Sequence, residues 1–213
     1  MTAKCEIVQL DSSRFKFAET IDERIMEWPH SWPKGEISYR INSFTDDTRK
    51  DWQIRAVTVA LRAWQLWLKD LKFRRERNPD THVDFNVEFE DLAHFDGKKG
   101  VLAHAYFPGQ GDISGDCHIN DEWNWVPGTH LSTMGKPPLV PILIHEFGHS
   151  LGLRHDVFDK TDIMYPSFDL GKKKNKIGGR SVSRMQERYG KRNLSARIIA
   201  YFQARRMRGS DFR

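Results

Sequence analysis

Apolar residues recur every three or four positions over residues 45–71, and this spacing predicts a long amphipathic helix. Thr45 or Asp46 would cap its start, and acidic side chains are favourable in its first turn. The apolar positions are Ile54, Val57, Leu61, Trp64, Leu68 and Leu71. Such a stripe is more typical of a surface that faces the core than of a cofactor-binding surface.

Four shorter segments show strand patterns, most of them by alternating apolar and polar residues. They are residues 36–42, 82–89, 100–107 and 116–120. Residues 139–152 predict a second helix, with Pro141 in its first turn and Gly152 at its end. A last helix is predicted over residues 181–189. This order predicts an α+β domain in which helices cover a twisted mixed sheet.

The second predicted helix carries a cluster of ionisable residues. His145 and His149 are four positions apart, so both lie on one helix face. Two imidazole nitrogens there can bind one Zn²⁺ at about 2.0–2.1 Å, and a turn at Gly152 would return His155 as third ligand. Three protein ligands leave a position for water, which is typical of a catalytic site. Glu146 is placed to take a proton from that water, whose pKa zinc lowers towards about 7.

Two simpler interpretations of the motif remain open. The histidines could be satisfied by hydrogen bonds inside an ordinary core helix, or they could hold a structural zinc without catalysis. The second interpretation gives no reason for a carboxylate at Glu146.

The string HEFGHSLGLRH, residues 145–155, resembles the metzincin signature, and DIMYP with Met164 resembles its methionine turn. Together with residues 31–41 and 100–118, these motifs most resemble the matrixins, the matrix metalloproteinase family. Asp156 after the third histidine is a departure that adamalysins share. The resemblance implies a metzincin-like zinc protease fold with a long N-terminal helix, a zinc-binding helix, the methionine turn and a C-terminal helix.

The resemblance also implies the organisation and activity of the chain. We expect a catalytic domain at residues 28–190, an N-terminal extension of unknown role at residues 1–27 and a basic tail at residues 191–213. The implied activity is zinc-dependent endopeptidase hydrolysis of extended protein substrates, with a zinc-bound water and Glu146 as general base. Substrate would add as a strand beside residues 101–107. A zinc-bearing binding protein that does not cut remains an alternative.

The resemblance implies a second, structural zinc site, because the segments HFD, AHA and GDCH match in order those that hold this zinc in matrixins. Its ligands would be His94, Asp96, His104 and His118, a set that suits a closed tetrahedral zinc. The loop between the first two segments is shorter than the family pattern. In the alternative interpretation, His94 and His104 are ordinary surface or strand residues.

The resemblance also implies calcium sites, because those of the matrixins take acidic side chains and backbone carbonyls from these same loops. The expected ligands are Asp84, Asp112 and Asp116, with solvated aspartates as the alternative. Asn120 stands where matrixins usually have Asp, which weakens the charge available to a further calcium site.

Composition adds expectations about partners and location. The 213 residues carry a net charge of +5, with basic clusters at residues 73–77, 171–176 and 190–213. These clusters predict attraction to polyanions, with solvated loops and a solvated tail as the alternative. The sequence contains neither a membrane-spanning apolar run nor a signal-peptide core, although the resemblance implies an extracellular protein. Cys5 and Cys117 do not form a disulfide framework, and Cys5 lacks the context of a zinc-capping pro-domain cysteine.

Overall fold

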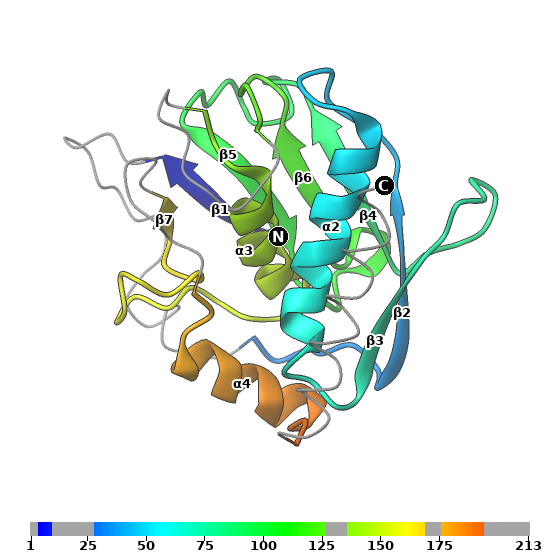
Figure 1. Ribbon diagram of the computed structural model, residues 1–213, viewed down its shortest axis with the longest axis vertical. Coiled ribbons are helices and arrows are strands. Elements are labelled where there is room, and N and C mark those ends of the chain that lie inside the picture. Colours follow the sequence, from blue (N-terminus) through cyan, green and yellow to red (C-terminus); the bar gives the residue numbers. More distant parts are fainter. Residues whose placement is uncertain (1–3, 10–27, 127–135, 169–175, 194–213) are drawn as a thin grey trace, which may run out of the picture.

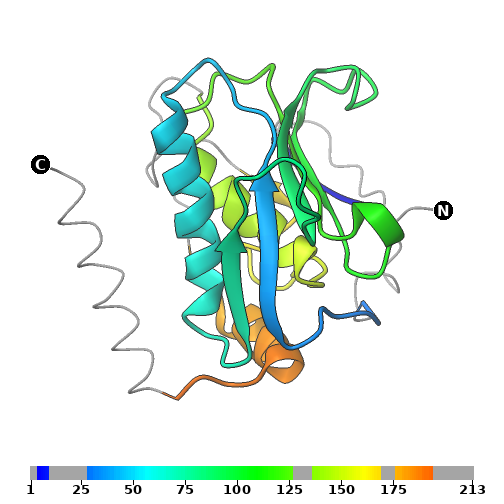
Figure 2. The same ribbon diagram turned by 90° about the vertical axis from the view of Figure 1, so that its right-hand side faces the viewer.

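A computed structural model describes residues 4–9, 28–126, 136–168 and 176–193. In these residues the chain forms one mixed sheet and three α-helices, which confirms the α+β prediction. The elements are β1 Lys4–Gln9, β2 Gly35–Ile41, α2 Lys50–Gln65, β3 Leu71–Arg75, β4 Phe85–Glu90, β5 Val101–Tyr106, the 3-10 helix η1 Gly111–Ile113, β6 Cys117–Asn120, α3 Leu139–Ser150, β7 Ser167–Phe168 and α4 Gly179–Tyr189. Helices α2 and α3 cover one face of the sheet, and α4 lies across its lower end (Figures 1 and 2).

The strand order within the described residues is β3-β2-β4-β6-β5-β1-β7. The first four strands of this order run parallel, and β5 is antiparallel to β6. The register of the antiparallel pair places His104 directly opposite His118. Directly opposite residues share one face of a sheet, so this pairing brings two predicted metal ligands together.

Helix α2 fixes the position of α3 through a buried apolar face. Ala60, Leu61 and Trp64 on α2 are at most 1% exposed. The indole Nε1 of Trp64 donates a hydrogen bond of 2.8 Å to the carbonyl of Ile144 on α3. Burial of a large apolar side chain contributes about 1.5–3 kcal/mol, so this interface holds α3 firmly against the rest of the core.

The start of the helix predicted over residues 45–71 was wrong. Helix α2 begins at Lys50, and neither Thr45 nor Asp46 caps it. The Gln53 side chain instead forms hydrogen bonds with the backbone of the preceding segment. Its Oε1 accepts from the Thr45 N–H at 3.1 Å, and its Nε2 donates to the Thr45 carbonyl at 2.8 Å. These bonds hold the chain before Lys50 in a non-helical loop.

The predicted end of this helix was also wrong. Helix α2 stops at Gln65, and Leu71 begins β3, a strand that was not predicted. Leu68 and Leu71 are nevertheless fully buried, as the apolar stripe required. Strand β3 includes the first residues of the basic segment 73–77, and Arg74 there lies 2.7 Å from the Glu36 carboxylate.

The other predicted elements are confirmed within one to three residues of their bounds. Strands β1 and β7 were not predicted, and both lie beyond β5 in the sheet order. The part of the chain that the structure describes has no helix with the length and apolar character needed to cross a bilayer. Most of the basic loop at 171–176 and of the tail at 191–213 lies outside the described residues, so polyanion binding stays a prediction.

Candidate active site and metal centres

The end of α3 turns the chain back toward the helix, as its glycine predicted. Gly152 has a φ of 96°, a left-handed conformation that favours glycine. Its N–H donates to the His149 carbonyl at 2.8 Å, and the Leu153 N–H donates to the Gly148 carbonyl at 2.8 Å. The chain therefore leaves the helix in a tight turn, three residues before His155.

The structure brings together the three histidines of the first predicted metal site. His145, His149 and His155 are buried and each offers a ring nitrogen, with these nitrogens within 4.8 Å of one another. The Nε2 atoms of His145 and His149 lie 2.9 Å apart. Two nitrogens that bind one tetrahedral zinc lie about 3.3 Å apart, given bonds of about 2.0–2.1 Å. The donor type and spacing therefore fit a zinc ion.

Backbone carbonyls orient two of these rings. His145 Nδ1 lies 2.6 Å from the carbonyl oxygen of Ile163, and His149 Nδ1 lies 2.6 Å from that of Leu153. An Nδ1–H that donates to a carbonyl leaves the Nε2 lone pair for a metal, an arrangement common around zinc. Burial also lowers the pKa of His149 to about 3, so this imidazole is neutral at physiological pH. Sequence reasoning missed both carbonyls, because any residue type can supply one.

The predicted methionine turn packs directly beneath α3. Met164 is fully buried, its N–H donates to Asp162 Oδ1 at 2.8 Å, and its carbonyl accepts from the Asp156 N–H at 2.9 Å. A Cβ at Gly148 would overlap Met164 Sδ, so this close approach requires a glycine on α3. The turn also positions the Ile163 carbonyl that holds His145.

Glu146 and the end of β5 complete the surroundings of the first triad. The Glu146 side chain is fully buried on α3, next to His145 in the sequence. Phe107 follows β5, and its ring centroid lies 5.6 Å from that of His149. Strand β5 therefore ends beside the triad.

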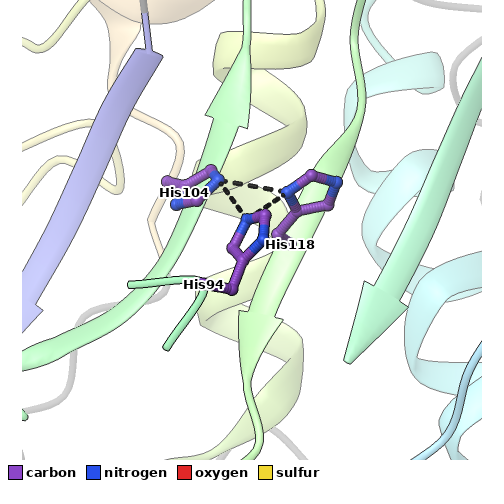
Figure 3. A group of neighbouring side chains, drawn as sticks. All are labelled: His94, His104 and His118. Carbon is purple, nitrogen blue, oxygen red and sulfur yellow. Dashed lines mark hydrogen bonds between the residues drawn. The ribbon is translucent and has the colours of Figure 1, made fainter. Parts of the chain in front are cut away.

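A second histidine triad lies on the opposite face of the sheet (Figure 3). His94 comes from the loop after β4, His104 from β5 and His118 from β6. His94 Nε2 lies 3.2 Å from His104 Nε2 and 2.7 Å from His118 Nδ1, and the last pair is 3.1 Å apart. These separations again suit three nitrogen ligands of one metal ion.

Comparison with known proteins identifies the family. Residues 31–190 match the family model described as Matrixin. The chain belongs to the matrixin family. It is 36% identical over 168 residues to a matrilysin of Felis catus, an alignment that covers 77% of this chain and 62% of the relative. It is 33% identical over 180 residues to matrix metalloproteinase-20 of Homo sapiens, an alignment that covers 80% of this chain and 35% of the relative. The chain thus spans less than two thirds of the length of these relatives.

Asp96, the fourth expected ligand of the second site, is not part of this matrixin's histidine group. Its φ is 55°, and its exposed carboxylate lies 3.4 Å from Lys98 Nζ. Glu88 on β4 approaches the group instead, with Oε2 3.4 Å from His118 Nε2. The His118 imidazole lowers the pKa of Glu88, and Asn42 Nδ2 donates to its other oxygen at 2.6 Å. Sequence reasoning missed Glu88, because only the β4–β6 register in the structure places it directly opposite His118.

The three expected calcium ligands do not gather into one acidic group within the described residues. Asp84 Oδ2 accepts from the Ser38 N–H and hydroxyl, each at 2.6 Å. Asp116 Oδ1 accepts from the Asn86 N–H at 2.7 Å, and burial raises the pKa of Asp116. Asp112 lies on the short helix η1. Two of the three aspartates thus have structural hydrogen bonds, and calcium binding stays a prediction.

Proposed function

We propose that this matrixin is a zinc-dependent endopeptidase that hydrolyses peptide bonds in extended protein substrates. The observation that carries the proposal is the buried triad of His145, His149 and His155, with Glu146 on the same helix. Zinc bound to the triad would lower the pKa of water and polarise the scissile carbonyl.

The chain's own residues would supply the remaining steps. Glu146 takes the proton of the attacking water and passes it to the leaving amine. The carbonyls of Ile163 and Leu153 keep the rings of His145 and His149 in place. The backbone of β5 orients an extended substrate by main-chain hydrogen bonds, the mode in which a peptide adds to a sheet edge.

The second triad is proposed to hold a structural zinc through His94, His104 and His118. Glu88 would orient the His118 ring from its far nitrogen, as carboxylates commonly do around zinc. Asp96 as fourth ligand and calcium at Asp84, Asp112 and Asp116 remain expectations of the family resemblance. The same resemblance supports an extracellular site of action.

Glu146→Gln tests the proposed mechanism with little change in shape. We expect zinc content and thermal stability close to those of the unaltered chain. Hydrolysis of an unfolded protein should fall by at least about 10²-fold, the usual contribution of a general base. Glu187→Gln is the matched control, because Glu187 is exposed on α4.

Two results would count against this proposal. Near-normal hydrolysis by the Glu146→Gln variant would remove Glu146 from the mechanism. An unaltered chain that binds zinc at the first triad, yet cleaves no unfolded protein, would favour a zinc-bearing binding protein.

A further inference from the structure

Asp156, the residue after the third histidine, carries a buried carboxylate that the proposed chemistry does not use. The residue is 1% exposed, and an aspartate is rarely so buried without a charged partner. Its N–H donates to the Met164 carbonyl at 2.9 Å, and its Oδ1 accepts from the Phe158 N–H at 2.9 Å. Asp156 therefore joins the chain at His155 to the methionine turn through its backbone, and holds the following turn through its side chain.

The cation that faces this carboxylate comes from the first turn of α4, beside the segment that follows the first triad (Figure 1). Arg180 Nε lies 3.6 Å from Asp156 Oδ2. The guanidinium carbon of Arg180 lies 4.4 Å from the centroid of the Phe158 ring, within the range of a cation–π contact. Because the ring covers the cation and the carboxylate is buried, the attraction within this ion pair is stronger than in an open surface pair.

A second buried carboxylate, that of Asp162, lies in the same region. Its Oδ1 accepts from the Met164 N–H at 2.8 Å. Burial raises the pKa of Asp162, and the negative charge of Asp156 raises it further. A Cβ at Gly178 would overlap the Asp162 carboxylate, so the start of α4 lies directly against this acid. Two acids thus share a buried region in which Arg180 and the N-terminal end of α4 supply positive charge.

We propose that Asp156 is a positioning residue for His155, and that Arg180 is the cation that keeps the Asp156 carboxylate in place. The inference rests on the proposed zinc binding by the first triad. The first two histidines of this triad lie on α3, and backbone carbonyls orient their rings, whereas His155 lies in the loop that follows the helix. The placement of a ligand in a loop depends on the contacts that hold the loop. The pair of Asp156 and Arg180 therefore connects α4 to the metal affinity of the first triad.

The substitution Arg180→Gln tests the inference, because it removes the cation and leaves the Asp156 carboxylate buried. We expect the dissociation constant of zinc at the first triad to rise about 10–100-fold, the usual effect when a metal ligand loses its support. The matched control is Arg49→Gln, which removes the same charge from an exposed ion pair with Asp51 at the start of α2.

Chelator competition measures the affinity for zinc at the first triad. The same titration of His145→Ala, which lacks a complete first triad, gives the contribution of the second triad, and this contribution is subtracted. Arg180 is 56% exposed, so its substitution should leave the fold intact.

A double variant shows whether charge is the cause of the loss. Asn at position 156 keeps an oxygen for the Phe158 N–H and needs no cation. Asp156→Asn/Arg180→Gln should therefore recover most of the affinity that Arg180→Gln loses, and a failure to recover it would overturn the role of the ion pair. Asp156→Ala should also lower the affinity, and Arg180→Gln should then have no further effect. If the alanine variant does not fold, the comparison of Arg180→Gln with the double variant still decides.

A spectroscopic measurement separates positioning from a purely structural role. With Co²⁺ in place of zinc, the visible absorption of the first triad should change in Arg180→Gln and stay the same in Arg49→Gln. A lower melting temperature of Arg180→Gln, with unchanged zinc affinity and an unchanged cobalt spectrum, would make the pair structural only and overturn the inference.

Metal affinity is measured without turnover, so this inference and the proposed function can fail separately. The expected pattern of zinc affinities, with no hydrolysis by any variant or by the unaltered chain, would overturn the proposed function and support the inference. Equal zinc affinity in Arg180→Gln and the unaltered chain, with hydrolysis by both, would overturn the inference and leave the proposed function standing.

Discussion

Gly148→Ala should destabilise the fold, although alanine is the better helix former. A Cβ at this position would overlap Met164 Sδ, lie 2.8 Å from Met164 Cε and lie 3.1 Å from the Trp64 ring. Alanine gains about 0.5–1 kcal/mol in a helix interior. Overpacking a close-packed core costs about 1–3 kcal/mol. Met164 is fully buried and its backbone is hydrogen-bonded on both sides, so we expect a net loss of about 1–2 kcal/mol.

The same substitution should weaken zinc binding at the first triad. Ile163 precedes Met164, and its carbonyl orients His145 at 2.6 Å. Displacing a partner of this kind typically lowers metal affinity about 10–100-fold. Thermal unfolding should show a melting temperature lower by about 2–8 °C. Competition with a chelator measures the loss of affinity. The matched control is Gly179→Ala in α4, where a Cβ meets nothing within 4 Å.

Two outcomes would refute this reasoning. One is a Gly148→Ala variant as stable and as zinc-avid as the unaltered chain. The other comes from a double-variant cycle with Met164→Ala, which alone should cost about 2–5 kcal/mol through the cavity it leaves. Because alanine at 148 would partly fill that cavity, the double variant should lose less than the sum of the two single losses. A strictly additive loss would mean that the two side chains do not meet.

The remaining predictions concern the second triad and the core. His104→Ala should lower zinc content from about two ions per chain to about one, and should also lower the melting temperature. Turnover per folded chain should change little. About one zinc per chain in both the variant and the unaltered protein would contradict this prediction. Asn120→Asp should cost about 1–3 kcal/mol in urea unfolding, because the buried amide donates to the Val101 carbonyl at 2.9 Å. Trp64→Phe should cost about 0.5–1.5 kcal/mol through loss of its bond to the Ile144 carbonyl; an unchanged urea midpoint in either variant would contradict that prediction.

The first triad could be predicted because its geometry is local. Two of its histidines follow the helical repeat on α3, and Gly152 specifies the turn that returns His155. The carbonyls that orient the rings could not be predicted in the same way. Ile163 lies 18 residues from His145, and its carbonyl carries no signal in its side chain.

The long helix shows the limit of periodicity. Leu68 and Leu71 are buried, as the apolar stripe predicted, but they lie beyond the helix end at Gln65. Burial of a residue does not specify its backbone conformation, because a turn followed by a strand can bury the same two side chains. The stripe therefore predicted the core correctly and the helix end wrongly.

The second triad and β1 depend on sheet order, which residue spacing does not contain. Asp96 was expected as a ligand because the segment HFD resembles the His-x-Asp pair of the matrixins, yet Glu88 is the carboxylate that meets His118. That meeting follows from the pairing of β4 with β6, which juxtaposes residues 30 positions apart. The strand conformation of β1 depends on sheet pairing in the same way. Its six residues pair with the edges of β5 and β7, although their own sequence did not predict a strand. Tertiary context often overrides weak local strand preference, and it does so here at the edge where we expect substrate to bind.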